Sequence, residues 1–129
     1  ADVYAHYMLR YLAITLCSGY VDQVFWWQLS AKGYGLVDDQ NQFHQRPAFI
    51  ALSFFLQLLG DARFERKYEA DSDTYLLEFS KGNQRYLMAW STAENAAPLT
   101  VDYTMAWDYL GTAATPKILS GAPVYLLLN

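Results

Sequence analysis

Few side chains in this chain have the types and spacing that chemistry at a metal ion requires. Asp38, Asp39 and Asn41 form an acidic cluster, but it lacks the spaced oxygen ligands and the following glutamate of a calcium-binding loop. His6 and His44 have no Cys, His, Asp or Glu partner at metal-site spacing. The sequence therefore predicts a solvated turn for the acidic cluster, structural roles for both histidines, no metal and no other cofactor.

Nucleophilic catalysis also lacks its usual residues. The single cysteine, Cys17, lies near the end of an apolar helical segment, which favours a small buried hydrophobic residue over a reactive thiol. The sequence has no Gly-x-Ser-x-Gly motif, no glycine-rich phosphate loop and no Cys/His arrangement. One cysteine also excludes a disulfide within the chain.

An apolar run over 21–29 is the most informative element, because it contains two adjacent tryptophans and is followed by a polar loop over 30–45. Continuous apolar runs are typical of parallel strands buried on both faces, and such strands need a neighbour on each side. Apolar segments at 3–16 and 47–59 predict helices before and after this strand. A strand feeding a helix is half of a βα unit, which does not stand alone.

The pattern changes to period two in the second half of the chain. Apolar and polar residues alternate strictly over 99–108, which predicts a strand with one core face and one wet face. The segments 74–80 and 84–91 flank a Lys-Gly-Asn turn and predict a hairpin. The segments 118–119 and 124–128 flank Ser-Gly-Ala-Pro and predict a last strand pair.

Together these patterns predict an α+β fold. Residues 1–62 would form two apolar helices and one barrel-type strand, and residues 63–129 a small antiparallel β-sandwich of about five strands. The chain of 129 residues is far shorter than the roughly 250 of a closed eight-unit βα barrel. A whole barrel is therefore excluded.

Composition and charge exclude further classes. Hydrophobic residues make up 53% of the chain, above the usual share of about 45–50%, so either the core is large or apolar surface faces a missing partner. The net charge of −4, without a run of Lys or Arg, predicts no nucleic-acid or anionic-lipid partner. The longest apolar helix is too short for the roughly 20 residues of a membrane span. The cellular compartment stays open.

Several motifs together resemble the C-terminal end of clan A glycoside hydrolases, in which a (β/α)8 barrel is followed by a β-sandwich. In order, these motifs are Phe25-Trp26-Trp27-Gln28-Leu29, Gly35-Leu36 with acidic residues after it, Arg46-Pro47-Ala48, Asp108-Tyr109-Leu110-Gly111 and Ala122-Pro123-Val124-Tyr125. The resemblance implies that 3–17 is the seventh barrel helix, 21–29 the eighth strand and 47–59 the eighth helix. The appended sandwich would begin at residue 64.

The same resemblance implies that the catalytic residues are absent from this sequence. Retaining enzymes of this clan use two glutamates, after the fourth strand and on the seventh, and both positions would precede residue 1. The glutamates that are present lie in polar or alternating contexts, which predicts solvated surface positions: Glu65, Glu69, Glu78 and Glu94. We therefore expect no hydrolysis by this chain alone.

What the resemblance carries over is a substrate-binding surface at the end of the eighth strand, formed by Trp26, Trp27 and Gln28. A flat aromatic face matches the C–H face of a sugar ring, and polar edges bind its hydroxyls. Strand alternation lets only one of the two tryptophans point into the barrel, and the sequence leaves open which one. The alternative is that both are core or interface aromatics.

Two functions follow as hypotheses. In the first, the chain is the C-terminal fragment of a glycoside hydrolase-like protein that acts on polysaccharide, with carbohydrate bound through the parent active site. The bare edges of its single strand then predict self-association of the isolated fragment. In the second, the sandwich is a stand-alone carbohydrate-binding or protein-interaction module without enzymatic activity. That module would expose a line of aromatics on one sheet face, drawn from Tyr75, Phe79, Tyr86, Trp90, Tyr103 and Trp107.

Overall fold

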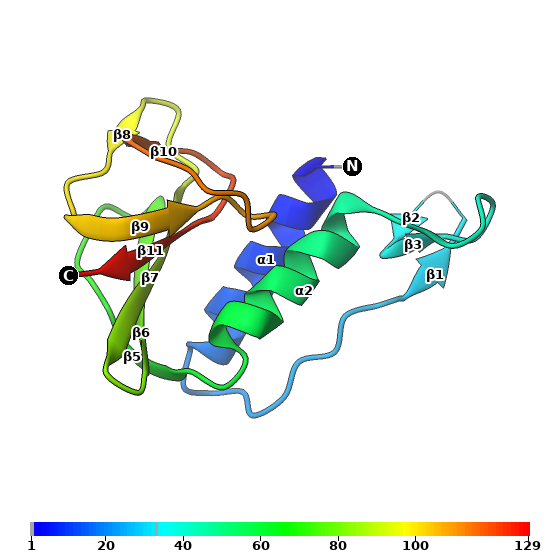
Figure 1. Ribbon diagram of the computed structural model, residues 1–129, viewed down its shortest axis with the longest axis horizontal. Helices are drawn as coiled ribbons and strands as arrows, with labels where there is room; N and C mark the ends of the chain where they lie inside the picture. The colour runs from blue at the N-terminus through cyan, green and yellow to red at the C-terminus, as the bar shows by residue number, and fades with distance from the viewer. Residues whose placement is uncertain (1, 33) are drawn as a thin grey trace.

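A computed structural model describes residues 2–32 and 34–129, and in these residues the chain forms two helices and eleven strands (Figure 1). The helices are α1 (Asp2–Leu16) and α2 (Pro47–Leu59). The strands are β1 (Ser30–Ala31), β2 (Tyr34–Gly35), β3 (Val37–Asp38), β4 (His44–Gln45), β5 (Arg63–Lys67), β6 (Thr74–Lys81), β7 (Gln84–Ser91), β8 (Ala97–Pro98), β9 (Tyr103–Trp107), β10 (Ile118–Leu119) and β11 (Val124–Leu128). The α+β class is confirmed.

Both predicted helices are confirmed, and each buries one apolar stripe. The buried residues of α1 follow helical spacing: Ala5, Met8, Leu9, Leu12 and Ala13. Helix α2 starts at Pro47, whose missing N–H costs nothing in a first turn, and it buries Ala48, Ala51, Phe55 and Leu59. It ends at Gly60, whose backbone N–H donates to the carbonyl oxygen of Leu56. Within the described ranges, neither helix is long and apolar enough to cross a bilayer.

The main sheet is antiparallel and has the strand order β5-β6-β7-β11-β9. The hairpin of β6 and β7 is confirmed with its predicted turn. The predicted last strand pair is wrong, because β11 lies between β7 and β9 while β10 pairs with β8. Strand β11 is apolar at all five positions, which suits a central strand covered on both faces.

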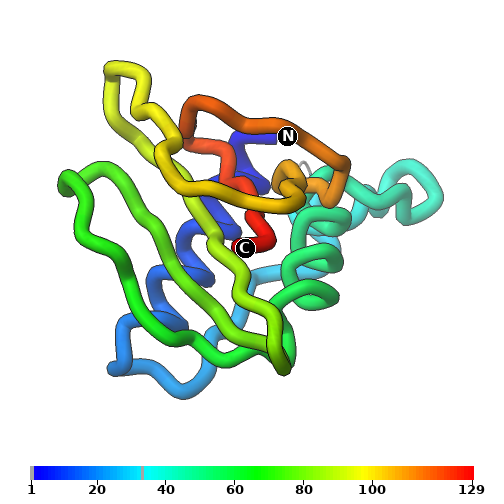
Figure 2. Tube along the Cα trace, turned by 60° about the vertical axis from the view of Figure 1, so that its left-hand side comes forward, coloured from blue at the N-terminus to red at the C-terminus, as the bar shows by residue number. Residues whose placement is uncertain are grey.

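The two faces of this sheet have different cover. One face packs against α1 and α2 and carries the largest buried residues, Trp90, Tyr125 and Met88 among them. The opposite face carries a smaller cluster around Leu87 and Leu126, covered by the two-stranded sheet of β8 and β10. The second half therefore contains a five-stranded sheet with the helices against one face (Figure 2) and the two-stranded sheet of β8 and β10 against the other, so the predicted five-stranded sandwich is not what forms.

A bulge interrupts the alternation predicted for 99–108. Leu127 pairs with Met105 and Leu128 pairs with Tyr103, so Thr104 has no partner on β11. The extra residue moves Ala106 to the same face as Tyr103 and turns Met105 to solvent. The expectation that Leu99, Val101, Tyr103, Met105 and Trp107 share one core face is therefore wrong.

The predicted barrel-type strand at 21–29 is not a strand in the structure. The segment is extended, but a strand is defined by ladder hydrogen bonds, and none of the described strands pairs with it to form them. The loop predicted for 30–45 contains four short strands in the order β2-β1-β3-β4, which form a small sheet at the end of the extended segment. This small sheet leads directly into α2 (Figure 1).

Candidate functional site

The candidate site is built on the segment 21–29, which is part of the connection between two helices that run in the same direction (Figure 1). Because α1 and α2 are parallel, the chain between them must return along their whole length. The return segment lies on the side of the helices that faces away from the main sheet (Figure 1). Sheet, helix pair and extended segment therefore form three successive layers.

Burial alternates along residues 24–29 of this segment as it does along a strand. Val24 and Trp26 pack against the helical core, whereas Phe25, Trp27 and Leu29 point away from it. Phe25 and Trp27 are 85% and 75% exposed. The segment thus has one face seated on the helices and one apolar face with nothing against it.

The backbone of the same segment lacks partners as well. Among the described residues, positions 21–28 form no backbone-to-backbone hydrogen bond. Regular pairing begins only at Leu29, whose carbonyl oxygen accepts from the N–H groups of Leu36 and Val37, each at 2.9 Å. An extended stretch with free backbone donors and acceptors, whose one charged side chain is Asp22 at its start, is a template for added strands.

The three predicted site residues have different surroundings. The indole Nε1 of Trp26 donates to the hydroxyl of Tyr4 at 2.9 Å, and its ring also lies 5.7 Å from that of Tyr11. The amide of Gln28 donates to the carbonyl oxygen of Ser30 at 2.8 Å. The peptide bond between Trp27 and Gln28 is cis. Trp26 is therefore held against α1, and Trp27 is the tryptophan with a free face.

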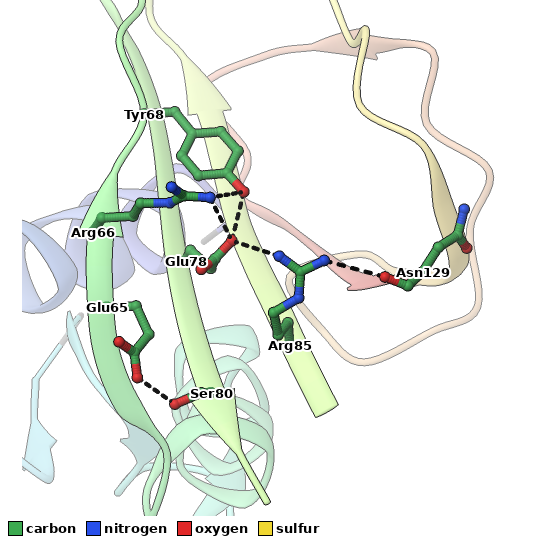
Figure 3. Close-up of polar contacts among 7 residues, drawn as sticks. All are labelled: Glu65, Arg66, Tyr68, Glu78, Ser80, Arg85 and Asn129. Atoms are coloured by element: carbon green, nitrogen blue, oxygen red, sulfur yellow. Dashed lines mark hydrogen bonds and ion pairs between the residues drawn. The ribbon is translucent and has the colours of Figure 1, made fainter. Parts of the chain in front are cut away.

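One glutamate departs from the predicted surface position. Glu78 is only 5% exposed and lies at the centre of a polar cluster on the outer face of β5, β6 and β7 (Figure 3). Its Oε1 accepts a 2.5 Å hydrogen bond from Tyr68 and is 3.5 Å and 3.4 Å from the guanidinium groups of Arg66 and Arg85. The expectation of a solvated Glu78 is wrong, because cross-strand pairing delivers these three partners.

This polar cluster has the character of a structural clamp. Arg85 also donates to the backbone oxygen of Asn129, so the cluster joins three strands to the end of β11 (Figure 3). The nearby Glu65 accepts from the Ser80 hydroxyl instead of pairing with Glu78. The carboxylate of Glu78 has two cationic partners, and none of the described carboxylates is paired with it. The cluster therefore has no pair suited to glycosidic acid/base chemistry.

The aromatic residues of the sheet form no exposed line. Phe79, Tyr86 and Trp90 are buried against the helices, and Tyr75 and Trp107 pack on the same core. Tyr75 stacks on Trp90 with ring centroids 4.9 Å apart. Tyr103 belongs to the smaller cluster on the other face. The sheet therefore offers no aromatic platform for the stand-alone module hypothesis.

The other titratable candidates are structural. Burial raises the pKa of the Cys17 thiol to about 11, which keeps it protonated and poorly nucleophilic at neutral pH. Burial also lowers the pKa of His6, whose ring meets that of Tyr109 edge-on at 4.4 Å. Throughout residues 2–32 and 34–129, no group of three His, Cys, Asp or Glu side chains is arranged to hold a metal ion.

One surface feature was not predicted from the sequence. The loop that joins β3 to β4 holds Gln42 and Phe43 at φ values of 52° and 57°, in the left-handed region that disfavours both residue types. The Phe43 ring is 66% exposed. The residue types at positions 42 and 43 do not predict a positive φ, because Asn and Gly are the residues that usually adopt it in such turns.

No protein-family model, no curated protein and no solved structure was found to match this chain.

Proposed function

We propose that this chain is the C-terminal portion of a glycoside hydrolase-like protein that acts on polysaccharide. In this proposal the helix–segment–helix part completes a (β/α) barrel, and the sheet braces the two helices from outside. The segment 21–29 is the last barrel strand, and Trp27 lies at the sugar-binding end of the barrel. The catalytic carboxylates are supplied by a part of the protein outside this sequence.

The observation that carries the proposal is the layered arrangement around the segment 21–29. Parallel helices joined by an extended return segment are what a βα repeat produces, since each strand runs opposite to its flanking helices. The segment is covered by helices on one face only and has no backbone partner over 21–28. Parallel strands on both edges and a packed barrel interior would satisfy all of these groups.

Trp27 is the residue on which sugar binding depends in this proposal. It lies at the carboxyl-terminal end of the segment, the end at which barrel enzymes bind their substrates. Its indole face is free, so it can stack on the C–H face of a pyranose ring. Trp26 and Gln28 position the segment around Trp27, because their side chains donate hydrogen bonds to the Tyr4 hydroxyl and to the Ser30 carbonyl oxygen.

The test compares two proteins, the 129-residue chain and the full product of its reading frame, on a panel of neutral polysaccharides. We expect reducing ends to be released by the full product, a strong loss of kcat/KM in its Trp27→Ala variant, and no hydrolysis by the 129-residue chain. Tyr20→Ala serves as the control, since this side chain is exposed and outside the site. The proposal fails if the full product hydrolyses nothing, or if the short chain is itself active.

A further inference from the structure

The tip of the β3–β4 hairpin is built around a turn that its residues do not favour. The N–H of His44 donates to the carbonyl oxygen of Asn41 at 3.0 Å, which closes a four-residue turn with Gln42 and Phe43 at the centre. Two central residues with positive φ define a type I′ turn, for which Asn-Gly is the preferred pair. Glutamine and phenylalanine carry a Cβ that opposes this backbone conformation.

Packing does not explain why a phenylalanine occupies this position. The ring of Phe43 is largely exposed, and it belongs to neither core cluster of the described residues. Its conformation therefore costs stability, and among the described residues no core contact compensates for that cost. Strained residues of this kind are concentrated where a side chain has to be presented to a ligand.

The chemistry around the ring suits a polyhydroxylated ligand. The residues before Phe43 are polar and exposed, and they supply a carboxylate and amide groups that both donate and accept: Asp39, Gln40, Asn41 and Gln42. An aromatic face among amide side chains combines stacking on C–H groups with hydrogen bonds to hydroxyls. A protein-docking site would instead require apolar neighbours around the anchor, and this loop has none.

The location of the loop agrees with this reading. The small sheet that carries the loop starts at the end of the extended segment, where the Leu29 carbonyl binds the β2–β3 backbone. Ligands of α/β folds bind beyond the carboxyl ends of the strands, in the loops that follow them. Trp27 precedes β1 by three residues, so the loop and the exposed indole belong to the same end of the molecule.

We infer that residues 39–44 form a carbohydrate-contacting loop in which Phe43 supplies the stacking face and the neighbouring amides bind hydroxyl groups. The choice of carbohydrate as the ligand class rests on the proposed function, whereas the presentation of Phe43 rests on the turn geometry. The loop is a contact separate from Trp27, and it binds sugar units beyond the one that stacks on that indole.

Affinity electrophoresis of the 129-residue chain in gels that contain a soluble glucan, xylan or mannan tests the inference. We expect at least one polysaccharide to retard the chain, and Phe43→Ala and Phe43→Gly to raise the dissociation constant about tenfold, since an aromatic contact contributes on the order of 1 kcal/mol in addition to the area that it buries. Phe43→Trp should retain it. Tyr20→Ala is the control, because this tyrosine is exposed but far from the loop in sequence.

A second readout separates recognition from a structural role. Glycine is preferred at the second central position of this turn, so Phe43→Gly should raise the thermal midpoint while it weakens sugar binding. If Phe43 instead stabilises the fold, the Phe43→Gly substitution would lower the thermal midpoint and leave sugar binding unchanged. That outcome would overturn the inference.

The remaining outcomes also discriminate. The inference is wrong if no polysaccharide retards the chain, if the Phe43 variants bind normally, or if they alter only self-association. Loss of binding in Trp27→Ala with normal binding in Phe43→Ala would reject the loop and still favour the proposed function. Phe43-dependent binding by the chain, together with an inactive full product, would reject the proposed function and keep the loop.

Discussion

The indole Nε1 of Trp26 donates a hydrogen bond of 2.9 Å to the hydroxyl oxygen of Tyr4, and the two rings meet edge-on at 5.7 Å. This contact joins the extended segment to the first turns of α1. It fixes which tryptophan faces the helices, and alternation then turns Trp27 outward. The orientation of the candidate site therefore depends on a residue of α1 that lies outside the segment itself.

Tyr4→Phe should destabilise the chain by about 1 kcal/mol, because the ring packing stays while the partly buried indole N–H loses its acceptor. Urea unfolding followed by tryptophan fluorescence measures the change. Tyr20→Phe is the matched control, since that side chain is exposed. Equal stability of both variants would show that the hydrogen bond does not hold the segment.

Glu78→Gln should cost about 2 kcal/mol, since two guanidinium groups lose their shared counter-charge and the Tyr68 hydroxyl loses a charged acceptor. We expect a smaller loss of unfolding free energy than for a fully buried ion pair, because the side chains of Arg66 and Arg85 are about half exposed and solvent screens their charges. Chemical denaturation measures it, with the exposed Glu94→Gln as control. A loss no larger than that of the control would contradict the clamp.

Gly111→Ala should destabilise the fold more than Gly82→Ala. Both glycines have positive φ, but a Cβ on Gly111 would lie 2.6 Å from the Phe54 ring, whereas one on Gly82 would meet nothing within 4 Å. The Gly82 variant therefore reports backbone strain alone, about 1 kcal/mol. The difference in unfolding free energy between the two variants isolates the packing of α2 against the 108–111 turn. Equal losses would mean that Phe54 moves aside freely.

Stability should fall as the pH decreases below about 6.5, the ordinary pKa of histidine. Burial lowers the pKa of His6 in the folded chain, and the charge of Arg10 lowers it further against the opposing effect of Asp2. The unfolded chain therefore binds a proton at a higher pH than the folded chain does, so acid favours unfolding. The stability that neutral His6 contributes is fully present above the pKa of histidine in the unfolded chain. It is lost as the pH falls from there through the lower pKa of His6 in the folded chain.

His6→Asn tests this dependence when unfolding free energies are measured from pH 8 to pH 5. The difference in unfolding free energy between the original chain and the variant should shrink as the pH falls. A difference that stays constant with pH would show that His6 is not the group responsible.

The sequence predicted those parts of the structure that have a local signal. The apolar segment 3–16 predicted helix α1, and the Lys-Gly-Asn turn predicted the β6–β7 hairpin, because both signals lie within a short stretch of the chain. The outward direction of Trp27 could not be predicted, since both tryptophans satisfy the same apolar run and the contacts of Trp26 with α1 distinguish them. Glu78 was missed because its burial depends on side chains that cross-strand pairing brings together.

Self-association of the 129-residue chain follows from the unpaired edges of 21–28. A second copy can pair with the free backbone groups and cover the exposed faces of Phe25 and Trp27, so the mean mass should rise with concentration. Phe25→Lys should shift the equilibrium toward monomer, because a charge on an edge strand opposes edge-to-edge pairing. Tyr20→Lys adds the same charge just before the unpaired stretch and should have a smaller effect. Sedimentation equilibrium measures both, and a chain that stays monomeric over a wide concentration range would contradict the prediction.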